Sequence, residues 1–165
     1  MTDWDARFMR IAEEVGSWSK DPGTKVGAVL VYDRRIISQG YNGFPKGVLD
    51  LESRYENRDT KLSLTVHAEV NAILNAAKNG ASTDGSTLYT TFAPCVHCST
   101  AVVQAGIARV VAPNFQFAPE RWRTNFAMGN DVLREAGIEV IHYTPEDYGS
   151  SRENLGLGHE ARRMP

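Results

Sequence analysis

The chain has 165 residues, of which 42% are hydrophobic and 23% charged, a balance typical of one globular domain with a real core. Because 18 Lys and Arg stand against 20 Asp and Glu, the formal net charge is -2, which argues against a protein that holds nucleic acid mainly through phosphates. No apolar run reaches the ~20 residues that span a bilayer, and the acidic start Met1–Asp5 does not resemble a secretory signal, so we expect no membrane contact and a cytoplasmic location.

The first third of the chain is expected to form a helix and a β-hairpin. Apolar residues recur at three- and four-residue spacing over residues 3–19, which predicts a helix that ends before Asp21-Pro22-Gly23. Residues 25–32 form an apolar run, which a turn at residues 33–35 connects to a returning strand at residues 36–41.

The rest of the chain alternates between strands and helices. Residues 42–65 are polar and turn-rich, and a connection of this length is usually functional or contains a short helix. We then expect helices at 67–77, 94–104 and 119–136, and strands at 86–92, 109–112 and 138–143. This order predicts a largely parallel sheet after the hairpin, covered on both faces, with the last two strands parallel. Residues 1–143 form the predicted domain, and residues 144–165 a tail with little apolar periodicity.

Two short motifs carry residues that can bind a metal. His67-Ala68-Glu69 and Pro94-Cys95-Val96-His97-Cys98 each stand at the start of a predicted helix. The chain has only two cysteines, and their C-x-x-C spacing without a secretion signal favours metal or redox chemistry over a disulfide. One imidazole and two thiolates suit zinc, and helix N-termini favour the thiolate form.

The number of ligands indicates a catalytic rather than a structural zinc. Structural sites usually have four protein ligands, whereas catalytic sites have three and an open position at which the pKa of water falls to about 7. Glu69 lies about 200° round an ideal helix from His67, so both converge only if the metal lies beyond the helix end. On that condition Glu69 is the candidate proton carrier. His97 as a fourth ligand would close the site, so we expect it to be exposed or packed.

The order H-x-E followed by P-C-x-x-C is the signature of zinc nucleobase deaminases. Over about residues 24–140 the chain also contains T-K-V-G-A-V-L-V, G-Y-N-G-F-P-K-G and Q-A-G-I-A-R-V-V. With these motifs the chain resembles the cytidine and deoxycytidylate deaminase family, most of all its deoxycytidylate branch. The resemblance implies an α/β, three-layer α/β/α cytidine-deaminase-like fold, whose five-stranded mixed sheet has its last two strands parallel.

The resemblance also implies roles for single residues. His67, Cys95 and Cys98 would bind zinc, and Glu69 would shuttle protons. Asn42 would contact the sugar or phosphate region, the Ala68 backbone would read the base edge, and Lys25 and Pro94 complete the expected substrate set. Gly40, Tyr41 and Gly43 are the residues expected at an effector site, because this region is associated with activation by dCTP and inhibition by dTTP, with magnesium accompanying the nucleotide. Relatives are often oligomeric, so a homo-oligomer, either a hexamer or a dimer, is expected.

Some features differ from the family pattern or have a plainer explanation. No cysteine stands directly after the G-Y-N-G-F-P-K-G run, in residues 47–52, so cysteine ligands for a second, structural zinc are absent, and residues 113–123 depart from the usual pattern. Phe115 and Phe117 either stack on a base or belong to the core. The charged residues of the 42–65 segment either form a solvated loop or provide a phosphate contact: Lys46, Arg54, Arg58 and Lys61.

The predicted function is hydrolytic deamination of deoxycytidine monophosphate to dUMP and ammonia, which supplies dUMP for thymidylate synthesis. A tRNA adenosine deaminase shares the motifs, but the acidic balance and the long segment after Asn42 argue against it. G-Y-N-G-F-P argues against a free-cytidine deaminase, while a deaminase of a modified nucleotide stays open. A non-catalytic zinc module that binds nucleotides would show four protein ligands or no turnover.

Overall fold

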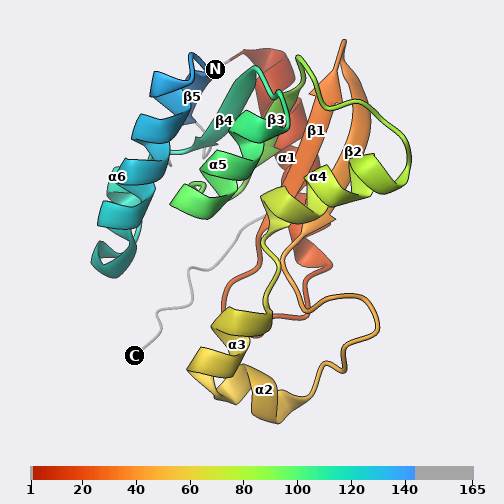
Figure 1. Ribbon diagram of the computed structural model, residues 1–165, viewed down its shortest axis with the longest axis vertical. Coiled ribbons are helices and arrows are strands. Elements are labelled where there is room, and N and C mark those ends of the chain that lie inside the picture. The colour runs from red at the N-terminus through yellow and green to blue at the C-terminus, as the bar shows by residue number, and fades with distance from the viewer. Residues whose placement is uncertain (1, 144–165) are drawn as a thin grey trace.

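The structure, a computed structural model, describes residues 2–143 and shows a sheet between layers of helices (Figure 1). Within that range no helix is both long and apolar enough to cross a bilayer. The expected tail, residues 144–165, lies outside the described residues. In chain order the elements are α1 (Asp3–Ser17), β1 (Gly27–Tyr32), β2 (Arg35–Tyr41), α2 (Glu52–Glu56), α3 (Arg58–Leu64), α4 (Ala68–Lys78), β3 (Thr87–Thr90), α5 (Val96–Gln104), β4 (Arg109–Pro113), the 3-10 helix η1 (Phe115–Phe117), α6 (Glu120–Glu135) and β5 (Glu139–Tyr143).

The five strands lie in the order β2-β1-β3-β4-β5. Strand β1 is antiparallel to both β2 and β3, whereas β3, β4 and β5 run parallel. The mixed sheet and the parallel pairing of the last two strands are thus confirmed. The antiparallel β1–β3 pair has a consequence for the site: it brings the start of β1, the end of β2 and the end of β3 to one edge, since Gly27 pairs with Tyr41 and Ala28 with Thr90.

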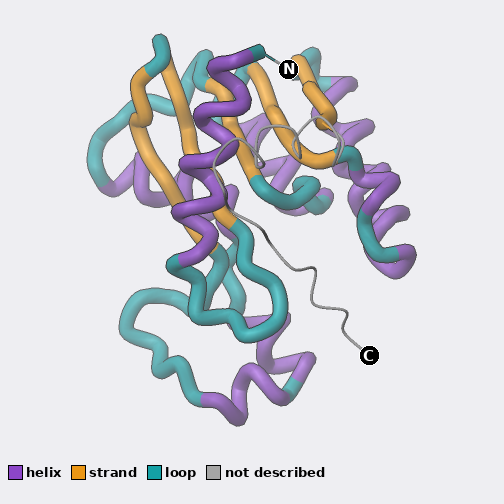
Figure 2. Tube along the Cα trace, turned by 180° about the vertical axis from the view of Figure 1, so that it is seen from behind, coloured by secondary structure: helices purple, strands orange, loops and turns teal. Residues whose placement is uncertain are grey.

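The layers follow from the alternation of side chains along the strands. Ala28 and Leu30 of β1 belong to the core beneath α4 and α5, while Val29 and Val31 belong to the core beneath α1. Because β1 is buried on both faces, its sequence is a continuous apolar run rather than an alternating one. Figures 1 and 2 show α1 alone on one face, and α4, α5 and α6 on the other.

Helix α1 is fixed to the sheet by a buried carboxylate. Asp5 is 1% exposed, accepts two hydrogen bonds from Arg109 of β4 at 2.7 and 3.0 Å, and accepts a third from the Tyr89 hydroxyl at 2.9 Å. It also completes a capping box with Thr2. Burial alone would raise the pKa of Asp5, but the hydrogen bonds from Arg109, Thr2 and Tyr89 hold it well below its usual range.

The polar segment between β2 and α4 contains two short helices, as expected for a connection of this length, after a non-helical stretch at residues 42–51. Helices α2 and α3 contain no buried residue and extend away from the sheet (Figures 1 and 2). Asn57 lies between them and caps α3 by accepting a hydrogen bond from Thr60 N at 2.9 Å. The ends of the segment are joined by two backbone hydrogen bonds between Gly43 and Val66, so this excursion leaves and rejoins the fold at one place.

Candidate active site

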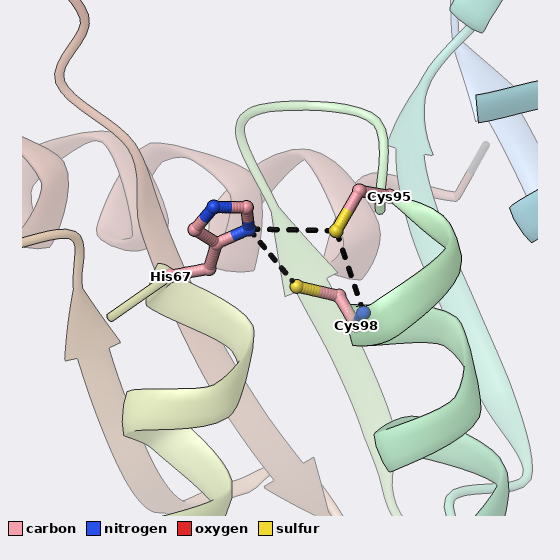
Figure 3. A group of neighbouring side chains, drawn as sticks. All are labelled: His67, Cys95 and Cys98. Carbon is pink, nitrogen blue, oxygen red and sulfur yellow. Dashed lines mark hydrogen bonds between the residues drawn. The ribbon is translucent and has the colours of Figure 1, made fainter. Parts of the chain in front are cut away.

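Two helix starts meet beside the edge of the sheet. The expected helices begin later than predicted, at Ala68 and at Val96, because His67 and Cys95 have extended backbones and act as the N-cap residues. Both side chains therefore leave the chain just before a helix, and Cys98 follows in the first turn of α5. Figure 3 shows His67, Cys95 and Cys98 directed toward one another from α4 and α5.

The spacing of these three side chains fits a tetrahedral zinc. His67 Nδ1 lies 3.3 Å from Cys98 Sγ and 3.5 Å from Cys95 Sγ, and all three donor atoms lie within 4.8 Å of one another. Zinc bonds of about 2.3 Å to sulfur and about 2.0 Å to nitrogen, at a tetrahedral angle, place those atoms about 3.6 Å apart. The donor set and its geometry therefore fit zinc with three protein ligands. His97 is exposed to solvent and is not part of the cluster.

The two thiols have unequal acidity. Hydrogen bonding with Cys98 lowers the pKa of Cys95 to about 4, with a further contribution from His67. The same contact and burial raise the pKa of Cys98. Hydrogen bonding with Cys95 also raises the pKa of His67. The metal-free cluster thus retains protons that zinc must displace, which makes zinc affinity dependent on pH.

Glu69 lies in the first turn of α4 and is only 3% exposed. Burial raises its pKa to about 7, and its carboxyl group interacts with the Cys98 side chain. Glu69 and His67 can converge only if the metal site lies beyond the start of the helix. The structure has this arrangement, because His67 precedes α4 and both residues line the same pocket. A carboxyl group of this pKa beside a metal cluster can gain and lose a proton near neutral pH.

The cluster forms one side of a pocket of about 410 Å³, which is the size of a small-molecule site. Its walls come from the 21–26 turn, the end of β2, helices α2 and α3, the loop after β3, and α6. Three aromatic rings form a connected wall: Phe92 meets Phe126 edge-on at 5.5 Å, and Trp122 stacks on Phe126 at 6.1 Å between centroids. This aromatic wall is apolar, whereas basic side chains line the pocket from α3 and the start of α6, and the acidic Asp21 and Glu56 line it from the 21–26 turn and from α2.

The predicted substrate residues separate into two groups. Asn42 and Ala68 line the pocket, although the Asn42 amide already bridges two backbone groups: its Oδ1 accepts from Val26 N, and its Nδ2 donates to Thr24 O, both at 2.8 Å. Lys25 does not line the pocket, and its Nζ donates to Ser17 O at 3.3 Å. Pro94 also lies outside this lining; it is buried next to α6, where it borders a second, much smaller cavity.

The three expected effector residues lie at the end of β2 and the start of the segment that connects β2 to α4, and they do not line the pocket. A Cβ atom on Gly40 would lie 2.3 Å from Ala72 N, so this glycine allows β2 to approach α4. Tyr41 is exposed and contacts Trp18 edge-on at 6.2 Å. Gly43 has open space around it. The contacts of these three residues within the described chain neither support nor contradict an effector role.

No sequence motif indicates the contribution of α6 to the pocket. Arg121, Trp122 and Phe126 line the pocket, although the sequence indicated only that this region departs from the family pattern. Of the four charged residues named as phosphate candidates, Arg58 and Lys61 line the pocket, whereas Lys46 and Arg54 do not. Of the two phenylalanines before α6, Phe115 packs against His142 and Phe117 is 62% exposed, so neither stacks over the pocket.

Comparisons with known proteins agree with this geometry. Residues 2–113 match the sequence model described as the cytidine and deoxycytidylate deaminase zinc-binding region. A deaminase in the luxG 3′ region of Aliivibrio fischeri is 40% identical over 141 residues, 85% of this chain and 93% of that protein. The deoxycytidylate deaminase of Mus musculus is 33% identical over 150 residues, 87% of this chain and 82% of that one.

A solved structure shows the same fold. The dCMP deaminase of the cyanophage S-TIM5, crystallised in complex with dCMP and dUMP, superimposes with a TM-score of 0.70 at 33% identity. The match covers 87% of this chain and 99% of that one.

Proposed function

The chain belongs to the cytidine and deoxycytidylate deaminase family, and on this premise we propose that it hydrolyses deoxycytidine monophosphate to dUMP and ammonia. The observation that carries the proposal is the placement of His67, Cys95 and Glu69 together in the wall of one pocket. The three metal ligands leave room for a fourth, and the buried proton carrier lies beside them. A structural zinc centre has no use for either feature.

The chain's own residues supply the remaining chemistry. Zinc, which His67, Cys95 and Cys98 would hold, would supply a water that is activated at neutral pH. Glu69 accepts a proton from the water and delivers protons to the ring nitrogen and to the departing amine, so that water and cytosine become uracil and ammonia. Its raised pKa suits both directions of transfer, because a group with a pKa near the working pH gives and takes protons equally well.

Basic residues at the pocket favour a nucleotide over a nucleoside. Lys61 is already paired with Asp21 at 2.8 Å, which partly neutralises its charge. In the described chain no ion pair engages Arg58 or Arg121, which line the pocket from α3 and from the start of α6. We assign these two guanidinium groups to the substrate phosphate, because arginine matches phosphate oxygens with two parallel hydrogen bonds.

An exposed apolar stripe supports the proposed homo-oligomer. Trp4, Ile11 and Trp18 follow one another at seven-residue spacing on one side of α1 and are 38%, 38% and 49% exposed. Large exposed apolar side chains at this spacing are typical of a contact surface. Analytical ultracentrifugation tests it: a dimer or hexamer is expected, and a chain that stays monomeric at the concentrations used for assays contradicts it. The cytoplasmic location stays a prediction.

A substrate panel tests the proposed function. Ammonia release or the change in ultraviolet absorbance is followed with the zinc-loaded chain and dCMP, CMP, cytidine, dCTP or dAMP. Each substrate is assayed with and without dCTP and dTTP, in the presence of magnesium. We expect dCMP to have the highest kcat/KM, with dCTP activating and dTTP inhibiting. If another substrate is turned over in preference to dCMP, or if none is, the proposed function is wrong.

A further inference from the structure

The metal-binding turn at the start of α5 is tied to α6 by a hydrogen bond that lies outside the pocket. The backbone N–H of Val96, the residue directly after Cys95, donates to Asn125 Oδ1 at 3.1 Å. Asn125 is half-buried and contributes no lining to the pocket. It therefore contacts the turn that carries a metal ligand without contacting the space that the substrate would occupy.

This hydrogen bond satisfies one of the amides at the helix start. The first amides of a helix have no partner within the helix. At this one, Cys98 N donates to Cys95 Sγ at 3.5 Å, and Ser99 N donates to Cys95 O at 2.8 Å. The Val96 amide is satisfied by Asn125 alone among the described residues. Without that acceptor, the amide adjoining Cys95 would lose its partner, and the turn would lose this hydrogen bond to α6.

A second contact, one helical turn along α6, shows that the approach is close. A Cβ atom on Gly129 would lie 2.9 Å from Pro94 O and 3.1 Å from Cys95 C, so only glycine allows α6 to lie this near the turn. Asn125 and Gly129 are four residues apart and thus share a face of the helix. The same face, four residues earlier, carries Arg121 to the pocket.

We propose that Asn125 is a positioning residue for the metal ligand Cys95. Its side-chain oxygen fixes the backbone of the Pro94–Val96 turn onto α6, and so holds the Cys95 sulfur at the correct distance from His67. Because α6 also carries Arg121 and Trp122, the same contact sets the spacing between the metal and the α6 wall of the pocket. The inference rests on the proposed zinc-dependent function, and it adds a residue that no motif of the sequence marks.

The test removes the acceptor and measures zinc affinity. In Asn125→Leu the side chain keeps its size but cannot accept a hydrogen bond, whereas Asn125→Asp keeps an acceptor oxygen. Zinc dissociation constants are measured by competition with a chromogenic chelator, and the thiolate-to-metal absorption band is recorded after cobalt substitution. Outer-shell partners of metal ligands typically contribute about 10–100-fold in metal affinity. We therefore expect Asn125→Leu to weaken zinc binding by about that factor and to shift the cobalt band. We expect Asn125→Asp to bind zinc as the parent does.

Asn130→Leu is the matched control. Asn130 lies on the same helix and is also half-buried, but its Oδ1 accepts a hydrogen bond from His142 Nε2 at 2.9 Å rather than from the metal turn. Its substitution should leave zinc affinity and the cobalt band unchanged. Unchanged zinc binding in Asn125→Leu, or an equal loss in Asn130→Leu, overturns the proposal. If Asn125→Leu does not fold, the proposal is tested with Asn125→Asp. Because this variant keeps the acceptor oxygen, a loss of zinc affinity in it contradicts the positioning role.

These measurements need no substrate, so they separate the two proposals. If zinc affinity falls in Asn125→Leu but the parent chain does not deaminate dCMP, only the proposed function is contradicted. A chain that deaminates dCMP while Asn125→Leu binds zinc like the parent contradicts the positioning role only.

Discussion

The environment of Glu69 explains how one carboxyl group can carry protons in both directions. The side chain is almost fully buried, and burial raises its pKa to about 7. An exposed glutamate, with a pKa of about 4.3, would be a weak base at neutral pH and would almost never hold a proton to donate. The position of the residue in the fold therefore supplies a property that the residue type lacks.

Replacing Glu69 should abolish turnover without emptying the metal site. General acid–base catalysis contributes about 10²–10⁴-fold, so Glu69→Gln should lower kcat by at least that order. Zinc content by elemental analysis should stay at the parent level, because Glu69 is not one of the three clustered ligands. Glu52→Gln, an exposed substitution on α2, is the control and should leave kcat unchanged. Retained activity in Glu69→Gln would remove this residue from its assigned role.

The two arginines of the pocket should act on the phosphate and not on the base. Arg58→Ala and Arg121→Ala should each reduce kcat/KM for dCMP by about 10–100-fold, since a charge-assisted hydrogen bond contributes about 1.5–3 kcal/mol. The same variants should change deoxycytidine turnover little, and Arg134→Ala, exposed at the far end of α6, serves as the control. An equal loss on nucleotide and nucleoside in steady-state kinetics would show that the arginines do not recognise the phosphate.

At the residue scale, two sequence motifs contain the three side chains that lie together in the structure, whereas no motif indicates the pocket wall. The three clustered residues belong to two short motifs: His67, Cys95 and Cys98. A zinc ion shared by the two motifs would require these side chains to lie together. Arg121 and Trp122 reach the same pocket only because α6 packs beside α5, a tertiary contact that no local pattern encodes. Lys25 shows the converse: its motif matches the family, but its side chain lies outside the pocket lining.

Among the elements, α1 is joined to β4 by a buried ion pair in addition to the apolar core that it shares with the sheet. Asp5→Asn removes the charge that Arg109 binds. Removing one partner of a buried pair costs about 3–5 kcal/mol, and we expect the lower end, because Arg109 is partly exposed and keeps its contact with Glu139 at 3.1 Å. Urea unfolding at pH 7 should show this loss, while Asp3→Asn, exposed in the same first turn of α1, should change stability little.

The pH dependence of this effect has a defined sign. Because the pKa of Asp5 is lower in the folded chain than its ordinary value of about 3.9, the folded state is stabilised above that pH. The stabilisation should fall away as the pH drops below about 4 toward the lowered folded-state pKa. The difference in unfolding free energy between parent and Asp5→Asn should shrink over that window. A difference that stays constant from pH 7 down to pH 2 would contradict the assignment.

Two glycines in one motif should respond differently to the same substitution. A Cβ atom on Gly40 would meet the backbone of α4, so Gly40→Ala should destabilise the fold by at least about 1–3 kcal/mol. Gly43 has open space and an ordinary backbone, so Gly43→Ala should be close to neutral in thermal unfolding. Similar melting temperatures for the two variants would show that β2 does not depend on this close approach to α4.

The order and type of the elements could be predicted from the sequence, whereas several boundaries could not. Apolar periodicity identified each main helix and strand, since burial imposes it. The starts of α4 and α5 were misplaced by one or two residues because His67 and Cys95 adopt extended N-cap conformations, a local geometry that periodicity does not report. The helices α2 and α3 cannot be predicted individually from the sequence, because they bury no apolar face that would impose a periodic pattern of apolar residues.

For the whole molecule, the site follows from the sheet topology. Ligands of open α/β sheets bind beyond the carboxyl ends of parallel strands, and here α5 starts just past the end of β3. The antiparallel β1 lies between β2 and β3, and so adds Val26 and Asn42 to that same edge. The sequence predicted the parallel half of this arrangement from its alternating pattern. The pairing of β1 with β3 is a long-range contact, which hydrophobic period alone does not specify.

The central claim is that one imidazole and two thiolates are the protein's complete contribution to the metal. A zinc-edge X-ray absorption spectrum of the active, zinc-loaded chain measures this directly. We expect two sulfur atoms at about 2.3 Å and the multiple scattering of a single imidazole near 2.0 Å. A second imidazole or a third sulfur in that shell would mean that the protein closes its own metal site, and would contradict the account.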